Sequence, residues 1–350
     1  MEMESPGYLK MSLAAAMTLD LKDGLFYRDA KSPCINLLLT YNSGCIASCS
    51  YCGLSKKRPG LYVKKSFIRV DWPAYPLPLI IEQIKEKRNR VKRICLSMIT
   101  RHQAVKDSLQ ITKRLKAELD IPISLLATPT ILKKRDLVDF KLSGVEMIGI
   151  AVDTATEELF EKHRGKGVKG PHRWEKYWQT VRDGVEIFGR SMVGVHLIVG
   201  LGETEVEMVE TIQRVNDEGA STHLFSFFPE PDSLLAQHPQ PPIGQYRRIQ
   251  LARYLIDEGI AHSQDFHFDQ MGKIIDFGVK TGKIEEIINS GRPFMTSGCP
   301  GRDGEVACNR PYANSLPGLQ IRNFPFLPEP EDIERIKKGL KCSAPLNPFC

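Results

Sequence analysis

The sequence predicts an α/β protein in which parallel strands alternate with covering helices. Six apolar runs of strand-like composition are separated by polar stretches whose apolar residues recur at helical spacing. Alternation of this kind favours parallel strands joined by crossover helices. With 350 residues the chain can bury a large core, either as one barrel-like domain with additions or as two domains.

The predicted elements follow one another in a regular order. Residues 1–30 are expected to form a short N-terminal helical extension, with the helix at 8–21, and residues 31–270 the barrel. The predicted strands are 35–41, 93–99, 121–127, 145–152, 192–200 and 222–228. The predicted helices are 77–90, 104–119, 133–142, 174–188, 206–218 and 246–258. Gly, Pro and Asn become frequent late in the chain, and we expect residues 271–350 to form a C-terminal region that wraps over the mouth of the barrel.

The composition is ordinary for a soluble globular protein with reduced thiols. The net charge is +6, and the basic residues are scattered without a basic–aromatic block, so no nucleic-acid surface is expected. The N-terminus is acidic where a signal peptide is basic, and the apolar stretch 11–17 is too short to cross a bilayer. We therefore expect a cytoplasmic protein with no membrane segment, whose nine cysteines stay reduced and available to metals.

Three cysteines, Cys45, Cys49 and Cys52, stand in one short loop after the first predicted strand. Their C-x₃-C-x₂-C spacing lets three thiolates hold three corners of a cubane iron–sulfur cluster. The fourth iron then has no protein ligand and is free to bind a small molecule. A zinc knuckle is the alternative, but structural zinc takes four ligands, and no further Cys or His lies close by in the sequence.

This cysteine loop, with Tyr51 just before the last cysteine, resembles the motif of the radical S-adenosylmethionine (SAM) superfamily. The resemblance implies a partial (βα)₆ TIM-like barrel of radical SAM type. It also implies a [4Fe-4S] cluster on Cys45, Cys49 and Cys52, with SAM bound to the open iron through its amino and carboxylate groups. Reactive groups in parallel barrels lie at the C-terminal ends of the strands, which is where the loop is expected.

Candidate SAM-binding residues lie at the ends of predicted strands. The hydroxyl of Ser97 or Thr100 is a candidate for the SAM amine, in a segment that departs from the superfamily's Gly-Gly-Glu pattern. Asp153 is a candidate for the ribose hydroxyls, because a carboxylate accepts two hydrogen bonds there. Capping of the next helix is an equally good explanation for Asp153.

The fifth strand carries a second candidate segment. The run from His196 to Glu203 resembles the superfamily's G-x-I-x-G-x-x-E adenine motif, with His196 in place of the first glycine. Gly200 lets the backbone approach the adenine, and Glu203 is expected to order the turn or cap the following helix. His196 either pairs with a buried neighbour or contacts SAM, and Tyr51 is expected near the adenine through its backbone, with plain packing as the alternative for its side chain.

Four cysteines stand in the last part of the chain, namely Cys299, Cys308, Cys342 and Cys350. Four thiolates are what a second cubane needs, and they equally suit structural zinc. Cys34 and Cys95 lie in or beside predicted strands and are treated as core thiols, with Cys34 facing the bottom of the barrel. Cys34 is the alternative fourth ligand to Cys350, because chain ends tend to fray.

Over nearly its whole length the chain resembles the two-component lipoyl synthases, most closely the second of their two subunits. The resemblance rests on segments 13–17 and 24–28, the cysteine loop, Cys299, the run from Cys308 to Tyr312, and 322–326. It implies insertion of sulfur into an octanoyl chain on a lysine of a lipoyl-carrier protein, with the second cluster consumed as the sulfur donor. The implied partners are that carrier protein, a second radical SAM subunit and an external reductant.

Two other functions remain open from the sequence. One is a different radical SAM enzyme, such as a methylase, a mutase or a peptide-modifying enzyme, in which the second cluster carries electrons. The other is a non-enzymatic scaffold that binds zinc. The patterns of single-chain lipoyl synthase, methylthiotransferases and biotin synthase are not found in the sequence. Arg310 and Tyr312 are assigned either to the substrate or second-cluster site or to loop structure.

Overall fold

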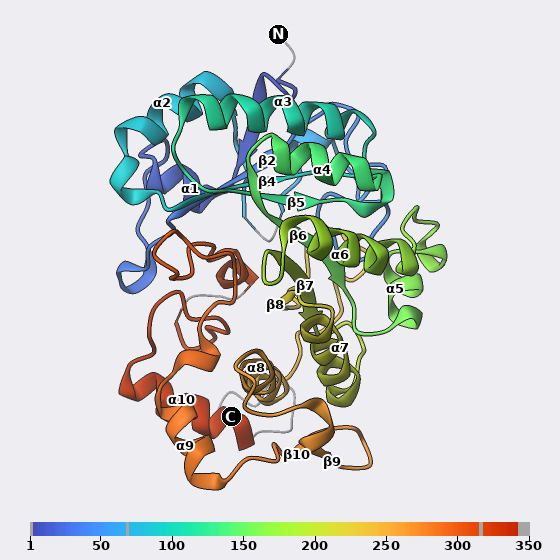
Figure 1. Ribbon diagram of the computed structural model, residues 1–350, viewed down its shortest axis with the longest axis vertical. Coiled ribbons are helices and arrows are strands. Elements are labelled where there is room, and N and C mark those ends of the chain that lie inside the picture. Colours follow the sequence, from blue (N-terminus) through green and yellow to red (C-terminus); the bar gives the residue numbers. More distant parts are fainter. Residues whose placement is uncertain (1–2, 68–69, 315–317, 342–350) are drawn as a thin grey trace.

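A computed structural model describes residues 3–67, 70–314 and 318–341. Its main sheet has eight strands in the order β3-β1-β2-β4-β5-β6-β7-β8 (Figure 1). Six of them are parallel: β2 (Cys34–Leu39), β4 (Arg93–Ser97), β5 (Ile123–Ala127), β6 (Val145–Asp153), β7 (Val193–Val199) and β8 (Ser221–Ser226). The prediction of an α/β fold is confirmed, and the sheet is an open partial barrel because β8 and β2 do not pair within the described residues.

Helices cover the outside of the sheet, and all of them except α5 were predicted. They are α2 (Leu77–Glu86), α3 (Gln103–Glu118), α4 (Lys134–Leu142), α5 (Glu157–His163), α6 (Trp174–Phe188) and α7 (Glu205–Asp217). These helices are amphipathic, which is why they pack on the sheet. In α3, for example, Ile111 and Leu115 lie on the buried stripe, and the other face is exposed. Strands covered on both faces appear in the sequence as continuous apolar runs, which is why their positions could be predicted.

The N-terminal extension differs from the prediction of one helix at 8–21. Tyr8–Met11 is strand β1, which pairs antiparallel with β2 and with β3 (Ala74–Pro76), and only Leu13–Thr18 forms a helix, α1. The ammonium group of Lys10, in β1, is buried and donates to the carbonyl oxygens of Tyr62 and Lys65. Pairing with neighbouring strands therefore overrides the helical propensity of this segment.

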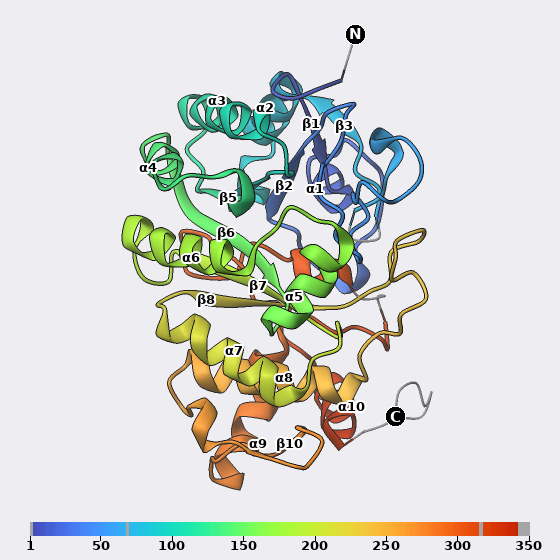
Figure 2. The same cartoon turned by 90° about the vertical axis from the view of Figure 1, so that its right-hand side faces the viewer.

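After β8 the chain forms α8 (Ile243–Asp257), α9 (Thr281–Asn289), α10 (Pro330–Lys341) and a small hairpin of β9 (His267–Phe268) and β10 (Ile274–Asp276). These elements lie together at the end of the molecule away from α2 and α3 (Figures 1 and 2). Short 3₁₀ turns occur at Tyr27–Asp29, Tyr62–Lys64, Arg88–Arg90, Pro129–Ile131, Lys166–Val168, Ser263–Asp265, Arg292–Phe294 and Arg310–Asn314.

The segment 295–312, which we call the seam segment, fills the opening between β8 and β2. The Ser297 hydroxyl accepts from the backbone N–H of Leu224 in β8 at 2.9 Å, and the Asn309 amide donates to the Lys31 carbonyl just before β2 at 2.8 Å. Arg93, the first residue of β4, donates to the Pro300 carbonyl at 2.5 Å. The seam segment therefore lies beside the strands and contacts both ends of β4, because its Arg310 donates to the Ser97 hydroxyl. That residues 271–350 wrap over the mouth of the barrel stays a prediction.

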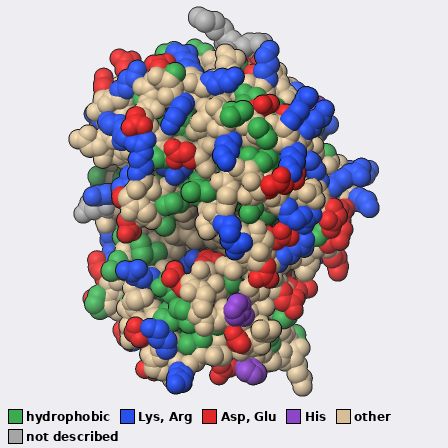
Figure 3. Space-filling view, in the orientation of Figure 1, with side chains coloured by type: hydrophobic (Ala, Val, Ile, Leu, Met, Phe, Trp, Pro, Cys, Tyr) green, Lys and Arg blue, Asp and Glu red, His purple; other side chains and the backbone are tan. Residues whose placement is uncertain are grey.

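The surface agrees with the modest net charge. Lys and Arg side chains are interspersed with Asp and Glu over the face drawn in Figure 3. No helix in the described part of the chain is long and apolar enough to cross a membrane.

Candidate active site

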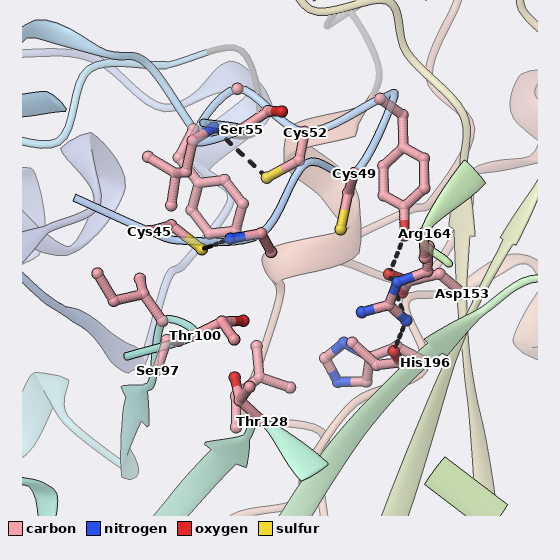
Figure 4. A pocket seen from close by; sticks show the side chains of 18 of the residues that line it. Cys45, Cys49, Cys52, Ser55, Ser97, Thr100, Thr128, Asp153, Arg164 and His196 are labelled. Carbon is pink, nitrogen blue, oxygen red and sulfur yellow. Dashed lines mark hydrogen bonds and ion pairs between the residues drawn. The ribbon is translucent and has the colours of Figure 1, made fainter. Parts of the chain in front are cut away.

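The three motif cysteines line a large cavity at the C-terminal ends of the parallel strands. The cavity encloses about 1210 Å³ of empty space, open mouth included, and Cys45, Cys49 and Cys52 are among its lining residues. Their sulfur atoms point into a common space, while Asp153, Arg164 and His196 lie on the facing wall (Figure 4). We call this space the SAM chamber, because the motif that forms it is the one expected to bind SAM.

The cysteine loop is held in shape by its own backbone and by β4. Gly44 has φ +64°, and a Cβ atom there would lie 3.0 Å from the Tyr62 ring, so the turn requires glycine. The N–H of Ile46 donates to the Thr100 carbonyl at 3.1 Å. The Arg101 guanidinium donates to the Gly44 carbonyl at 2.9 Å. The loop is therefore fixed to the end of the neighbouring strand before any ligand binds.

The triad sulfurs are in surroundings suited to thiolate ligands. Backbone N–H groups of Ala47 and Leu54 donate to the sulfurs of Cys45 and Cys52, each at 3.4 Å. Burial raises the pKa of the Cys49 thiol to about 11 and raises that of Cys52 well above its usual range. Buried thiols of this kind ionise when a cationic metal centre takes the place of their protons, so the residues fit an iron–sulfur cluster.

Asp153 and Arg164 form a buried pair on the wall facing the triad. The Asp153 carboxylate accepts from the Tyr51 hydroxyl at 2.5 Å and lies 3.3 Å from the Arg164 guanidinium. Arg164 also donates to the carbonyl oxygens of Ala151 and Val152. Asp153 is not the helix cap, because Thr156 caps α5. The predicted ribose ligand and the predicted adenine neighbour Tyr51 are thus in direct contact.

The remaining predicted SAM contacts divide into two groups. Ser97 and Thr100 line the chamber. Gly200 and Glu203 lie in the turn after β7 and are not among the residues that line it. The Glu203 carboxylate accepts from the N–H groups of Gly200 at 2.6 Å and Leu201 at 2.9 Å, so it orders this turn. Burial raises the pKa of Glu203 to about 7.

Four other cysteines come together below the chamber. Cys34, Cys95, Cys299 and Cys308 are buried in one cluster with Met147, and we call them the thiol cage. Cys34 and Cys308 are in hydrogen-bond contact, and Cys308 lies 3.8 Å from the Asn36 amide oxygen. The hydrogen bond from Cys34 lowers the pKa of Cys308 to about 7.

The cage only partly matches the predicted second ligand set. Cys299 and Cys308 belong to it, and Cys34 and Cys95, which were expected to be core thiols, lie buried beside them. Cys342 and Cys350 lie outside the described residues. The strand register explains why Cys34 and Cys95 lie together. Asn36 of β2 is paired with Cys95 of β4, so Cys34, two residues before Asn36, has its side chain on the same face of the sheet as Cys95.

Small residues make room for the cage and for two imidazole rings inside the barrel. A Cβ atom on Gly194 of β7 would lie 2.3 Å from the His223 ring, so this position cannot carry a side chain without moving that ring. His196 and His223 face each other with ring centroids 5.4 Å apart, and His196 also packs on Phe225. Burial lowers the pKa of both histidines, that of His223 to about 4, so they are neutral donors and acceptors.

The thiol cage borders a second, smaller cavity that shares a wall with the SAM chamber. Leu126, His196, Phe225 and Arg310 line both spaces. Among the described residues, no group of three or more His, Cys, Asp or Glu side chains could hold a metal ion in its present arrangement. The sulfur atoms of the cysteine loop and those of the thiol cage thus border two cavities that share four lining side chains.

Comparison with known proteins agrees with this architecture. The family model of the radical SAM superfamily matches residues 39–215, which is just over half of the chain. No curated protein matches the chain. The chain therefore belongs to the radical SAM superfamily, whose enzymes use a [4Fe-4S] cluster and SAM.

Solved structures with a similar fold are distant in sequence. The FeFe-hydrogenase maturase HydG from Carboxydothermus hydrogenoformans is 16% identical with a TM-score of 0.49, over 70% of this chain and 56% of that one. The radical SAM methyltransferase TsrM from Kitasatospora setae is 12% identical with a TM-score of 0.42, over 88% of this chain and 62% of that one. The chain thus spans less than two thirds of either protein.

Proposed function

We propose that the protein inserts sulfur into an octanoyl chain carried on a lysine of a lipoyl-carrier protein, as one subunit of a two-component lipoyl synthase. The observation that carries the proposal is the thiol cage, which lies directly below the SAM chamber. Membership of the superfamily supplies the radical chemistry, and the whole-chain resemblance supplies the substrate. The proposed partners are the carrier protein, a second radical SAM subunit and an external reductant.

In the proposed enzyme, the residues that line the SAM chamber have different roles. The cluster held by Cys45, Cys49 and Cys52 would supply one electron to SAM, which yields methionine and a radical that abstracts hydrogen from carbon. Asp153, whose carboxylate accepts a hydrogen bond from the Tyr51 hydroxyl, would accept hydrogen bonds from the ribose hydroxyls in exchange. Ser97 and Thr100 offer hydroxyl oxygens near the triad.

The lining of the chamber suits an alkyl substrate. Its apolar side chains include Leu38, Met98, Leu126, Ile198, Phe225 and Phe227. Burial of an alkyl chain against such side chains contributes about 0.8 kcal/mol for each CH₂ group. Because Leu126 and Phe225 also border the cage, a substrate carbon in this part of the chamber would lie near the cage sulfurs.

The thiol cage is the proposed site of a second iron–sulfur cluster. Four buried cysteines supply the ligand number of a cubane, and Asn36 and Ser124 provide polar neighbours. A cluster in this place would supply the sulfur atom. The enclosure of the cage restricts access to it from outside, while the shared wall leaves it next to the SAM chamber.

Iron analysis tests the two ligand sets. Anaerobically reconstituted protein is expected to bind about eight irons per chain. Cys34→Ala and Cys95→Ala should remove the second cluster, while Cys350→Ala and Cys342→Ala serve as matched controls and should retain it. Retention in the first pair and loss in the second would support the C-terminal ligand set instead. Bound zinc without iron would overturn the enzyme assignment.

Turnover tests the reaction itself. The reconstituted protein, with SAM, a reductant and an octanoyl-lysine peptide, alone and with the partner subunit, should form deoxyadenosine and add sulfur to the peptide. The sulfide content of the cage cluster should fall in proportion to product. Deoxyadenosine formation with an intact second cluster and no sulfur in the peptide would favour an electron-carrying role in another radical reaction.

A further inference from the structure

Arg310 stands in the wall between the SAM chamber and the thiol cage. It begins the 3₁₀ turn Arg310–Asn314, two residues after Cys308, the last cage cysteine, and lines both cavities. Its side chain is only 7% exposed. One terminal nitrogen donates to the Ser97 hydroxyl at 2.9 Å, and the guanidinium lies over the rings of Phe67 and Trp72, 4.9 and 5.6 Å from their centroids.

The charge of Arg310 has no carboxylate partner in the described part of the chain. None of the ion pairs within the described residues includes Arg310, and its buried Nε atom has no hydrogen-bond partner. A buried charge without a counterion is strongly disfavoured, and a buried N–H without an acceptor adds a further cost. An anionic group is therefore expected beside this guanidinium.

The cage lies within the reach of this charge. Arg310 lines the smaller cavity together with Cys95, Cys299 and Cys308, and its backbone hydrogen-bonds Cys308. A cubane held by four thiolates carries a net negative charge and gains another on reduction. Since net charge and hydrogen bonds to the sulfurs set the potential of such clusters, a fixed cation here favours the reduced form.

We propose that Arg310 is the countercharge of the second cluster and holds its reduction potential up by facing it from the wall of the SAM chamber. This role rests on the second cluster assigned above to the thiol cage. It makes Arg310 a positioning residue that acts on the cluster and not on SAM.

A second buried arginine, Arg93, also attracts the thiolates of Cys299 and Cys308, but it differs from Arg310 in its partners. Arg93 is 4% exposed, but its guanidinium donates to the Pro300 carbonyl and to the Ser124 hydroxyl at 2.9 Å, and it lies 3.9 Å from Glu146. These partners tie the seam segment to β4 and β5. Arg310 differs because its Nε remains available.

The test measures the midpoint potential of the second cluster by redox titration with electron paramagnetic resonance. The full-length chain carries Cys45→Ala, Cys49→Ala and Cys52→Ala, so that only the cage holds iron. In this triple variant, Arg310→Met should shift the midpoint potential to more negative values. Arg310→Lys keeps the charge, so its midpoint potential should stay close to that of the triple variant alone, which is the parent protein. Arg214→Met is the matched control, because Arg214 stacks on Trp178 outside both cavities, and it should leave the potential unchanged.

Each outcome decides one question. An unchanged potential in Arg310→Met, or equal shifts in the Met and Lys variants, overturns the countercharge role. Loss of iron in Arg310→Met with retention in Arg310→Lys supports it, and loss in both indicates a structural role and overturns it. Absence of iron from the parent, by contrast, contradicts the second cluster and therefore the proposed function.

Discussion

At the scale of single residues, the chamber is organised by charges that neutralise one another. Asp153 has φ +69°, a left-handed conformation that aspartate tolerates better than most residues, and this directs its carboxylate toward Arg164 and Tyr51. Arg164 in turn contacts Cys49, so the pair connects the ribose side of the chamber to the triad. A change in any of these three side chains therefore affects both the cofactor and the fold.

Tyr51→Phe should lower the free energy of unfolding of the apo protein by about 1.5–3 kcal/mol, because the hydrogen bond it removes is made to a charged acceptor. Urea denaturation measures this change. Tyr254→Phe is a suitable control, since no hydrogen bond of its hydroxyl occurs among the described residues, and should change stability little. Equal effects of the two substitutions would contradict the importance of the contact between Tyr51 and Asp153.

Glu203 gives the fold a dependence on pH. Because burial raises its folded pKa from 4.5 to about 7, the neutral carboxyl is favoured in the folded state. Stability from this group is fully present below about pH 4.5 and is lost as the pH rises through about 7. The difference in unfolding free energy between wild type and Glu203→Gln should therefore change over this interval and be constant above it, which denaturation at several pH values would reveal.

At the scale of elements, strand β7 carries a glycine whose absence of a side chain shapes the barrel interior. Gly194→Ala should destabilise the protein by about 1–3 kcal/mol, because the new methyl group collides with the His223 ring. Gly282→Ala in α9 is the matched comparison, since nothing lies within 4 Å of its Cβ position, and it should not lower the melting temperature. Calorimetry of both variants distinguishes crowding from a general effect of alanine.

The elements also show which parts of the fold sequence patterns can locate. The parallel strands and their helices were predicted within a few residues, because continuous burial of β4 or a buried stripe on α3 leaves a local pattern. The strand β1 was missed, since only its pairing with β2 and β3 makes it a strand. The helix α5 was missed as well, since it has only 7 residues and leaves only a short apolar pattern in the sequence.

The candidate sites show the same division. The triad lies in one loop, so its spacing alone suggested the cluster site, whereas the cage gathers cysteines from β2, β4 and the seam segment. No local spacing can reveal that combination, because it depends on strand register and on where the seam segment inserts. Arg310 was noted in the sequence without a distinct role. Its burial, and the lack of a hydrogen-bond acceptor for its Nε atom among the described residues, are properties of the folded chain alone.

At the scale of the whole molecule, the proposed second cluster predicts that metal binding and folding are coupled through the seam segment. Ligands that bind only the folded state stabilise it, so removal of iron by a chelator should lower the melting temperature of the reconstituted protein. Cys308→Ala should reduce the rise in melting temperature that iron produces, because the thiol cage holds the seam segment against β2. Cys342→Ala is the control, and a melting temperature independent of iron would contradict the coupling.

The seam segment has a consequence for biogenesis. Cys34 and Cys95 leave the ribosome early, whereas Cys299 and Cys308 emerge only when most of the polypeptide has been made. The machinery that delivers iron can thus find a complete loop of three thiols on a nascent chain, but all four cage thiols only after late translation. For the proposed second cluster, this order predicts that the cluster of the cysteine loop can be inserted before the cluster of the thiol cage.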